Sequence, residues 1–75
     1  MPVEQSVIED WLAGRAIPGV AFRLNELVRI LAGQAAEQSA WVVCLVELEP
    51  EPLYTVELVP GRADLHVTQS ALAPC

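Results

Sequence analysis

Two stretches of alternating apolar residues flank a short segment with two prolines, and this arrangement constrains the fold more than any other feature. The stretches cover residues 40–49 and 53–59, and the segment between them is Glu49-Pro50-Glu51-Pro52. Proline lacks the N–H group that a strand ladder needs, so this segment is expected to be a turn. A period of two with many β-branched residues is typical of β-strands. We therefore expect two strands joined at this turn.

Shorter β-like stretches lie on either side of this pair. Residues 27–31 precede it, followed by a small and polar loop over 32–39, and residues 63–67 come after the turn Pro60-Gly61-Arg62. Residues 70–72 are expected to form one helical turn. Short strands separated by turns at close intervals indicate a mainly β domain of four to five antiparallel strands.

The N-terminal segment has a helical period instead. Apolar residues form one stripe of an amphipathic helix over residues 3–13, and Gly14 suits the position that follows a helix. Ser6 and Glu9 have capping-box spacing, so a start near Ser6 is the alternative.

The helix and the strands define three parts of one small domain. We expect the N-terminal helix within residues 1–14, a connection over 15–26 and the β-domain over 27–73. Turns are expected in the connection at Pro18-Gly19 and at Asn25-Glu26.

Alternation along the strands also assigns their faces. One set is purely apolar and forms the expected core: Val28, Ile30, Val42, Cys44, Val46, Tyr54, Val56 and Leu58. The other face of the second strand carries Trp41, Val43 and Leu45, which are too apolar for open water. Either Trp11 and its helix stripe or a second copy of the chain is expected to cover them.

Charge and composition exclude several classes of function. The chain has 75 residues, 53% of them hydrophobic, and a net charge of −6 with four arginines or lysines in total. Binding to nucleic acids comes mainly from basic side chains that neutralise phosphates, so none is expected. No apolar run is long enough to span a membrane, and no secretory signal is visible, so a cytoplasmic protein is expected.

The reactive side chains form no recognisable catalytic set. His66 has only Asp64 nearby on its strand face, and a surface histidine is the favoured interpretation. Cys44 is expected in the core and Cys75 as an exposed terminal thiol, although a disulfide between them stays open. We therefore expect no enzyme activity, no metal and no cofactor.

Acidic residues cluster around the proline-containing turn. They are Glu47, Glu49, Glu51 and Glu57. The favoured interpretation is a solvated tip, and the alternative is an acidic patch that recognises a basic partner.

Residues 22–72 resemble the KOW and SH3-like barrel domains of ribosomal proteins and transcription elongation factors. The resemblance rests on Val28-Arg29-Ile30, Gly33, Ala36, Val42-Val43, Tyr54-Thr55-Val56-Glu57-Leu58, Val67, Ser70 and Leu72. It implies a small, strongly bent sheet of about five strands, that is, a small SH3-like antiparallel barrel. Family members that touch RNA carry basic residues in their loops, and this chain does not.

The sequence thus predicts a non-enzymatic module that binds a protein partner or a second copy of itself. The predicted partner-binding residues are Trp11, Trp41, Val43, Leu45, Glu47, Glu49 and Glu51. The alternative, implied by the resemblance alone, is a KOW-like accessory factor of transcription or translation that contacts RNA or ribosomal components.

Overall fold

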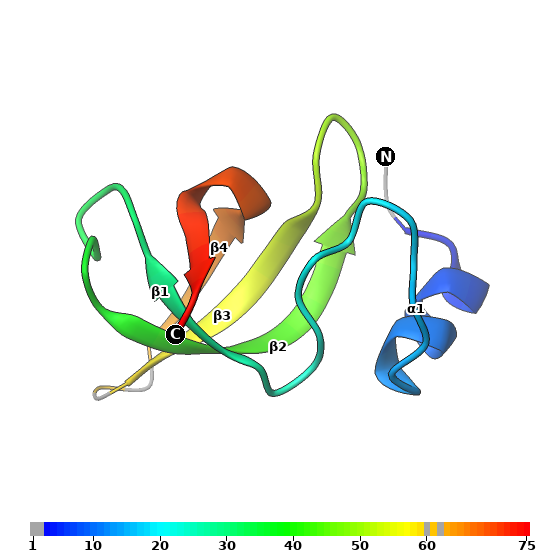
Figure 1. Ribbon diagram of the computed structural model, residues 1–75, viewed down its shortest axis with the longest axis horizontal. Coiled ribbons are helices and arrows are strands. Elements are labelled where there is room, and N and C mark those ends of the chain that lie inside the picture. Colours follow the sequence, from blue (N-terminus) through cyan, green and yellow to red (C-terminus); the bar gives the residue numbers. More distant parts are fainter. Residues whose placement is uncertain (1–2, 60, 62) are drawn as a thin grey trace.

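The chain folds into one antiparallel sheet with a helix at one end (Figure 1). The computed structural model describes residues 3–59, 61 and 63–75. In chain order the elements are α1 (Gln5–Leu12), β1 (Leu27–Ile30), β2 (Ser39–Glu47), β3 (Leu53–Val59), β4 (Asp64–Thr68), the 3-10 helix η1 (Gln69–Ala71) and β5 (Leu72–Pro74). The expected mainly β fold of four to five antiparallel strands with a short N-terminal helix is confirmed.

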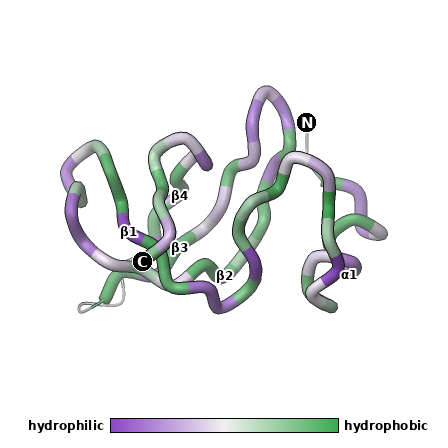
Figure 2. Tube along the Cα trace, in the orientation of Figure 1, coloured by the Kyte–Doolittle hydropathy of each residue, from purple (hydrophilic) through white to green (hydrophobic). Residues whose placement is uncertain are grey.

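The five strands follow the order β4-β3-β2-β1-β5, and every neighbouring pair is antiparallel. The sheet is not closed, because β4 and β5 form its two edges. It is strongly bent, with α1 at one end of the long axis and the β1–β2 loop at the other (Figure 1). Hydrophobic residues follow the strands, and most hydrophilic stretches lie in the loops (Figure 2).

Two irregularities in β2 change the faces that simple alternation predicts. Val42 pairs with Val56 and Cys44 pairs with Thr55, so β2 contains one more residue than β3 between these pairs. A second such shift lies between Leu45 and Glu47. Each extra residue in a bulge moves the following side chains to the opposite face of the sheet.

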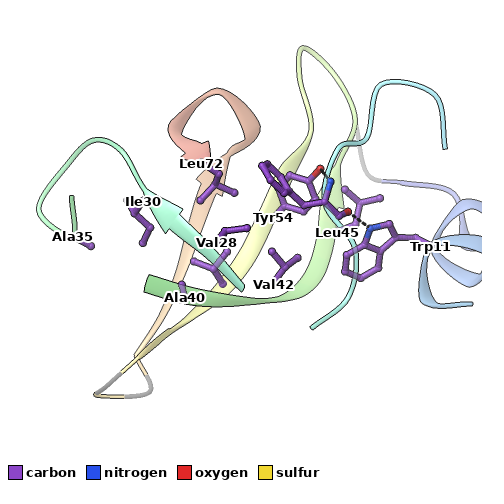
Figure 3. Packing of buried hydrophobic residues seen from close by; sticks show 11 residues of the cluster. Trp11, Val28, Ile30, Ala35, Ala40, Val42, Leu45, Tyr54 and Leu72 are labelled. Carbon is purple, nitrogen blue, oxygen red and sulfur yellow. Dashed lines mark hydrogen bonds between the residues drawn. The ribbon is translucent and has the colours of Figure 1, made fainter. Parts of the chain in front are cut away.

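On β2 the predicted core face is therefore correct before the first bulge, at Val42, and wrong between the two bulges, at Cys44 and Leu45. Val28, Ile30, Val42, Tyr54 and Val56 are buried as predicted. The core also contains Trp11, Phe22, Ala35, Ala40, Leu45 and Leu72 (Figure 3).

The bulge accounts for the two main errors on β2. Cys44 was expected inside and is exposed, whereas Leu45 was expected on the second face and is only 1% exposed. Val46 and Leu58, also expected inside, are half-buried. Cys75 is an exposed free thiol, as expected.

The helix and the connection agree with the main sequence prediction. α1 begins at Gln5, one residue before the alternative start at Ser6 and two residues after the predicted start at residue 3, but Glu4 is the N-cap, so Ser6 lies inside the helix and does not cap it. Gly14 follows the helix with a φ of 80°, a conformation that favours glycine. No helix in the described part of the chain is long and apolar enough to cross a membrane.

Both expected turns of the connection form. Gly19 has a φ of 81° and Asn25 a φ of 66°. The connection then joins the sheet, because Asn25 N donates to the Val42 carbonyl at 2.7 Å and Val42 N donates to the Glu26 carbonyl at 3.0 Å. The turn predicted at residues 60–62 includes two positions that lie outside the described residues.

The last strand is the element that the sequence prediction missed. Residues 70–72 were expected to form a helical turn, and η1 occupies nearly this place. The chain then continues into β5, which pairs with β1 through Leu72 opposite Ile30 and Ala73 opposite Arg29. A three-residue strand that ends in proline has too little alternation to be seen in the sequence.

Candidate functional site

The predicted partner-binding residues do not form one surface. Trp11 and Leu45 are buried in the core, and Trp41 is exposed on the outer face of β2. Val43 and Glu47 are half-buried on β2, while Glu49 and Glu51 belong to the β2–β3 loop.

Trp11 fixes the N-terminal helix to the rest of the fold. Its side chain is 2% exposed, and its indole Nε1 donates a hydrogen bond to the Phe22 carbonyl at 2.9 Å (Figure 3). Phe22 in turn packs edge-to-face against Tyr54, with ring centroids 5.7 Å apart. Trp11 therefore has a structural role in holding α1 and the connection onto the sheet.

Glu51 also has a structural role rather than that of a free carboxylate at a loop tip. Its Oε1 accepts a hydrogen bond from Ser70 N at 2.8 Å, and its Oε2 lies 3.2 Å from Ser70 Oγ. Gln69 N donates to the Pro52 carbonyl at 2.8 Å. The β2–β3 loop is thereby attached to η1, whose first N–H groups have no partner within so short a helix.

A polar network joins η1 to the connection. The Tyr54 hydroxyl donates to Gln69 Oε1 at 2.6 Å, and the same oxygen accepts from Ala21 N at 2.8 Å. Gln69 Nε2 donates to the Gly19 carbonyl at 3.0 Å. Burial raises the pKa of the Tyr54 hydroxyl, because the low-dielectric core disfavours the phenolate. These hydrogen bonds join the side chain of Gln69 to Tyr54 and to the backbone of the connection.

The outer face of the sheet combines apolar and acidic side chains. Trp41, 41% exposed, lies opposite Leu27 on β1 and Glu57 on β3, and Asp64 on β4 continues the row beyond Glu57. Because Trp41 is exposed, the expected cover of this face by α1 is wrong for this residue.

A cavity of about 670 Å³ lies on the open side of the sheet, and we call it the edge cavity. It is bounded by Ile30 and the β1–β2 loop, by Leu58 on β3, by residues 65–68 of β4 and by Ala71 of η1. Its volume is within the range of ligand sites, which are mostly apolar with a few polar groups.

The side chains around the edge cavity have almost no titratable chemistry. Among the described lining residues, His66 is the one ionisable side chain, and the other polar side chains are Gln34, Gln38 and Thr68. Within residues 3–59, 61 and 63–75 there is no cluster of three or more His, Cys, Asp or Glu side chains that could hold a metal ion.

The sequence prediction missed this site because it is formed by tertiary structure. The β1–β2 loop and β4 are separated by about thirty residues and meet only because β2 and β3 bend between them. The one available signal was the small, polar composition of residues 32–39, which is typical of functional loops as well as of simple connections.

No family model, no curated protein and no solved structure matches this chain.

Proposed function

We propose that this chain is a non-enzymatic interaction module that binds a segment of a partner protein in the edge cavity. The carrying observation is the cavity itself, about 670 Å³ on the open side of the sheet. Its apolar lining from Ile30, Leu58, Leu65 and Val67 would bury apolar side chains of a ligand, and the glutamines of the loop would orient it.

The residue types at the cavity support binding more than catalysis. General acid–base catalysis needs a titratable group held against a partner or substrate. None of the side-chain hydrogen bonds between described residues involves His66, which is exposed. The bent five-stranded sheet also supports the SH3-like fold that the family resemblance implies, a fold that hosts many unrelated functions.

The test uses two exposed alanines in equivalent substitutions. Ala32 lines the edge cavity, whereas Ala16 lies in the connection, shortly after α1 in the chain, and α1 is at the other end of the molecule from the β1–β2 loop. Ala32→Trp should obstruct the cavity and Ala16→Trp should not.

Random peptides displayed on phage are selected against the unaltered protein, and the binding of selected peptides is measured by calorimetry. We expect Ala32→Trp to weaken binding at least about tenfold, the effect of losing roughly 1.4 kcal/mol, and Ala16→Trp to leave it unchanged. The proposal is wrong if no peptide is selected, or if the two variants bind selected peptides equally well.

A further inference from the structure

The free edge of β4 is ready to pair with another strand. The hydrogen bonds from Leu58 N to the Ala63 carbonyl, 2.9 Å, and from Gln69 N to the Pro52 carbonyl, 2.8 Å, lie at the two ends of the β3–β4 ladder. Because hydrogen-bonded and non-hydrogen-bonded pairs alternate in an antiparallel ladder, Leu65 and Val67 direct their backbone groups to β3.

The backbone groups of every second residue of β4 point away from β3, toward the free edge of the sheet. The same alternation directs the backbone N–H and C=O groups of Asp64 and His66, and the N–H of Thr68, toward the free edge. Four consecutive residues of β4, 65–68, line the edge cavity. A ligand in this cavity therefore lies against backbone donors and acceptors as well as against apolar side chains.

The opposite edge of the sheet offers no equivalent ladder. Cys75 N donates to the Leu27 carbonyl and Leu31 N to the Ala71 carbonyl, so Leu72 and Pro74 are the residues of β5 that face outward. The N–H of Leu72 already donates to the Gln69 carbonyl, and proline has no N–H. Of the two edges, β4 is the one that can accept a strand.

We propose that the partner segment is an extended peptide that pairs antiparallel with β4 as a sixth strand, a proposal that rests on the proposed function. An apolar small molecule would leave the backbone groups of His66 unpaired, whereas a peptide backbone satisfies them. The five residues of β4 match a peptide stretch of about 17 Å. All other pairs in this sheet are antiparallel, which makes that orientation continuous with the existing ladder.

The two faces of the sheet define the side chains of this peptide. Residues on the inner face would contact Leu58 and Leu65, which favours apolar side chains there. On the outer face Asp64 lies directly opposite Glu57, and no basic residue pairs with either of them among the described salt bridges. The chain has a net charge of −6. The peptide is therefore one of alternating apolar and basic residues.

A second copy of this chain fits the edge less well. A two-fold axis through His66 would align the outward groups of two β4 strands, with Asp64 opposite Thr68 of the second copy. It would also bring together two chains that each carry a charge of −6. Charge complementarity thus selects the basic peptide, and self-pairing is an outcome of the test.

The probe is a capped hexapeptide of alternating lysine and valine, titrated into the ¹⁵N-labelled full chain. Directly opposite residues in antiparallel strands share a face, so the lysines would direct their backbone groups to β4 and the valines would enter the cavity. N-methylation of the lysines should weaken binding at least about tenfold, and N-methylation of the valines should have little effect. Asp64→Asn should also weaken binding, whereas Glu9→Gln, an exposed acid on α1, should not.

Each result separates the strand-pairing proposal from the broader function. Equal binding of both methylated peptides, or a stronger loss for the valine set, overturns strand pairing. If such binding is still blocked by Ala32→Trp, the cavity remains the binding site and only the pairing is wrong. Absence of amide shifts in residues 64–68 at millimolar peptide overturns the inference, while the phage selection decides the function independently. A dimer in sedimentation that Thr68→Pro dissociates shows that the edge pairs with a second copy, and this too overturns the inference.

Discussion

The attachment of α1 through Trp11 gives a prediction whose size follows from the structure. The indole is 2% exposed and donates to the Phe22 carbonyl at 2.9 Å, so Trp11→Ala removes both a large buried surface and a buried hydrogen bond. Trp11→Phe keeps most of the buried surface and removes the donor together with a smaller part of the ring. The second tryptophan provides the control, because Trp41 is 41% exposed on the sheet.

The magnitudes follow from known effects of core substitutions. Trp11→Ala should lower the free energy of unfolding by about 3–5 kcal/mol, the range for truncation of large core aromatics. Trp11→Phe should lower it by about 1–3 kcal/mol, because the buried Phe22 carbonyl loses its partner. Trp41→Ala should change it by less than about 1 kcal/mol. A 75-residue chain has a total stability of about 4–11 kcal/mol, so the first change removes a large part of it.

Urea unfolding followed by far-ultraviolet circular dichroism measures these differences. The urea concentration at the midpoint should be highest for the unaltered chain, lower for Trp11→Phe and lowest for Trp11→Ala. The slope of the transition should be retained in Trp11→Phe. If Trp11→Ala and Trp41→Ala destabilise the chain equally, then α1 is not part of the cooperative fold, and our account of the N-terminal helix is refuted.

Three further predictions concern the contacts of Glu51 with Ser70, the buried hydroxyl of Tyr54 and the surface charge. Glu51→Ala should lower the unfolding free energy by about 0.5–1.5 kcal/mol, because the contacts with Ser70 are lost. The control Glu49→Ala, at an exposed residue of the same loop, should lower it by less than about 0.5 kcal/mol. Equal urea midpoints for the two variants would contradict a stabilising role of the Glu51–Ser70 contacts. The raised pKa of Tyr54 means that its stabilisation is complete below the ordinary value of 10.0 and is lost as the pH rises through the folded-state pKa. Thermal melts across this range should show a steeper alkaline decline for the unaltered chain than for Tyr54→Phe, and parallel declines would argue against burial of the hydroxyl. With a net charge of −6, the chain should not bind a random oligonucleotide at physiological salt, and micromolar affinity by fluorescence anisotropy would overturn this.

Local sequence patterns were sufficient for the parts of the fold that depend on local chemistry. The prolines around Glu51 end β2, and the alternation in residues 53–59 gives the bounds of β3 as the structure has them. The positive φ of Gly14 and of Asn25 was also predictable, because few residue types adopt that conformation without strain.

The features that the sequence did not reveal depend on partners distant in the chain. Cys44 and Leu45 exchange faces because of a bulge whose position is determined by pairing with β3, and nothing in the apolar run itself marks it. Glu51 resembled a solvated carboxylate because its partner Ser70 lies nineteen residues away. The edge cavity was hidden for the same reason, since two of its walls, the β1–β2 loop and β4, lie about thirty residues apart in the chain.

The unequal edges of the sheet also limit how large an assembly of this chain can grow. A unit with two open edges can add neighbours on both sides, and such growth leads to fibrils. Here Pro74 has no N–H, and the N–H of Leu72 already donates to the Gln69 carbonyl, so β5 offers no free N–H at its outer edge within the described strand. The sheet can therefore be extended at β4 only. In the proposed pairing, the added strand occupies the one open edge at β4, so the assembly ends at two chains.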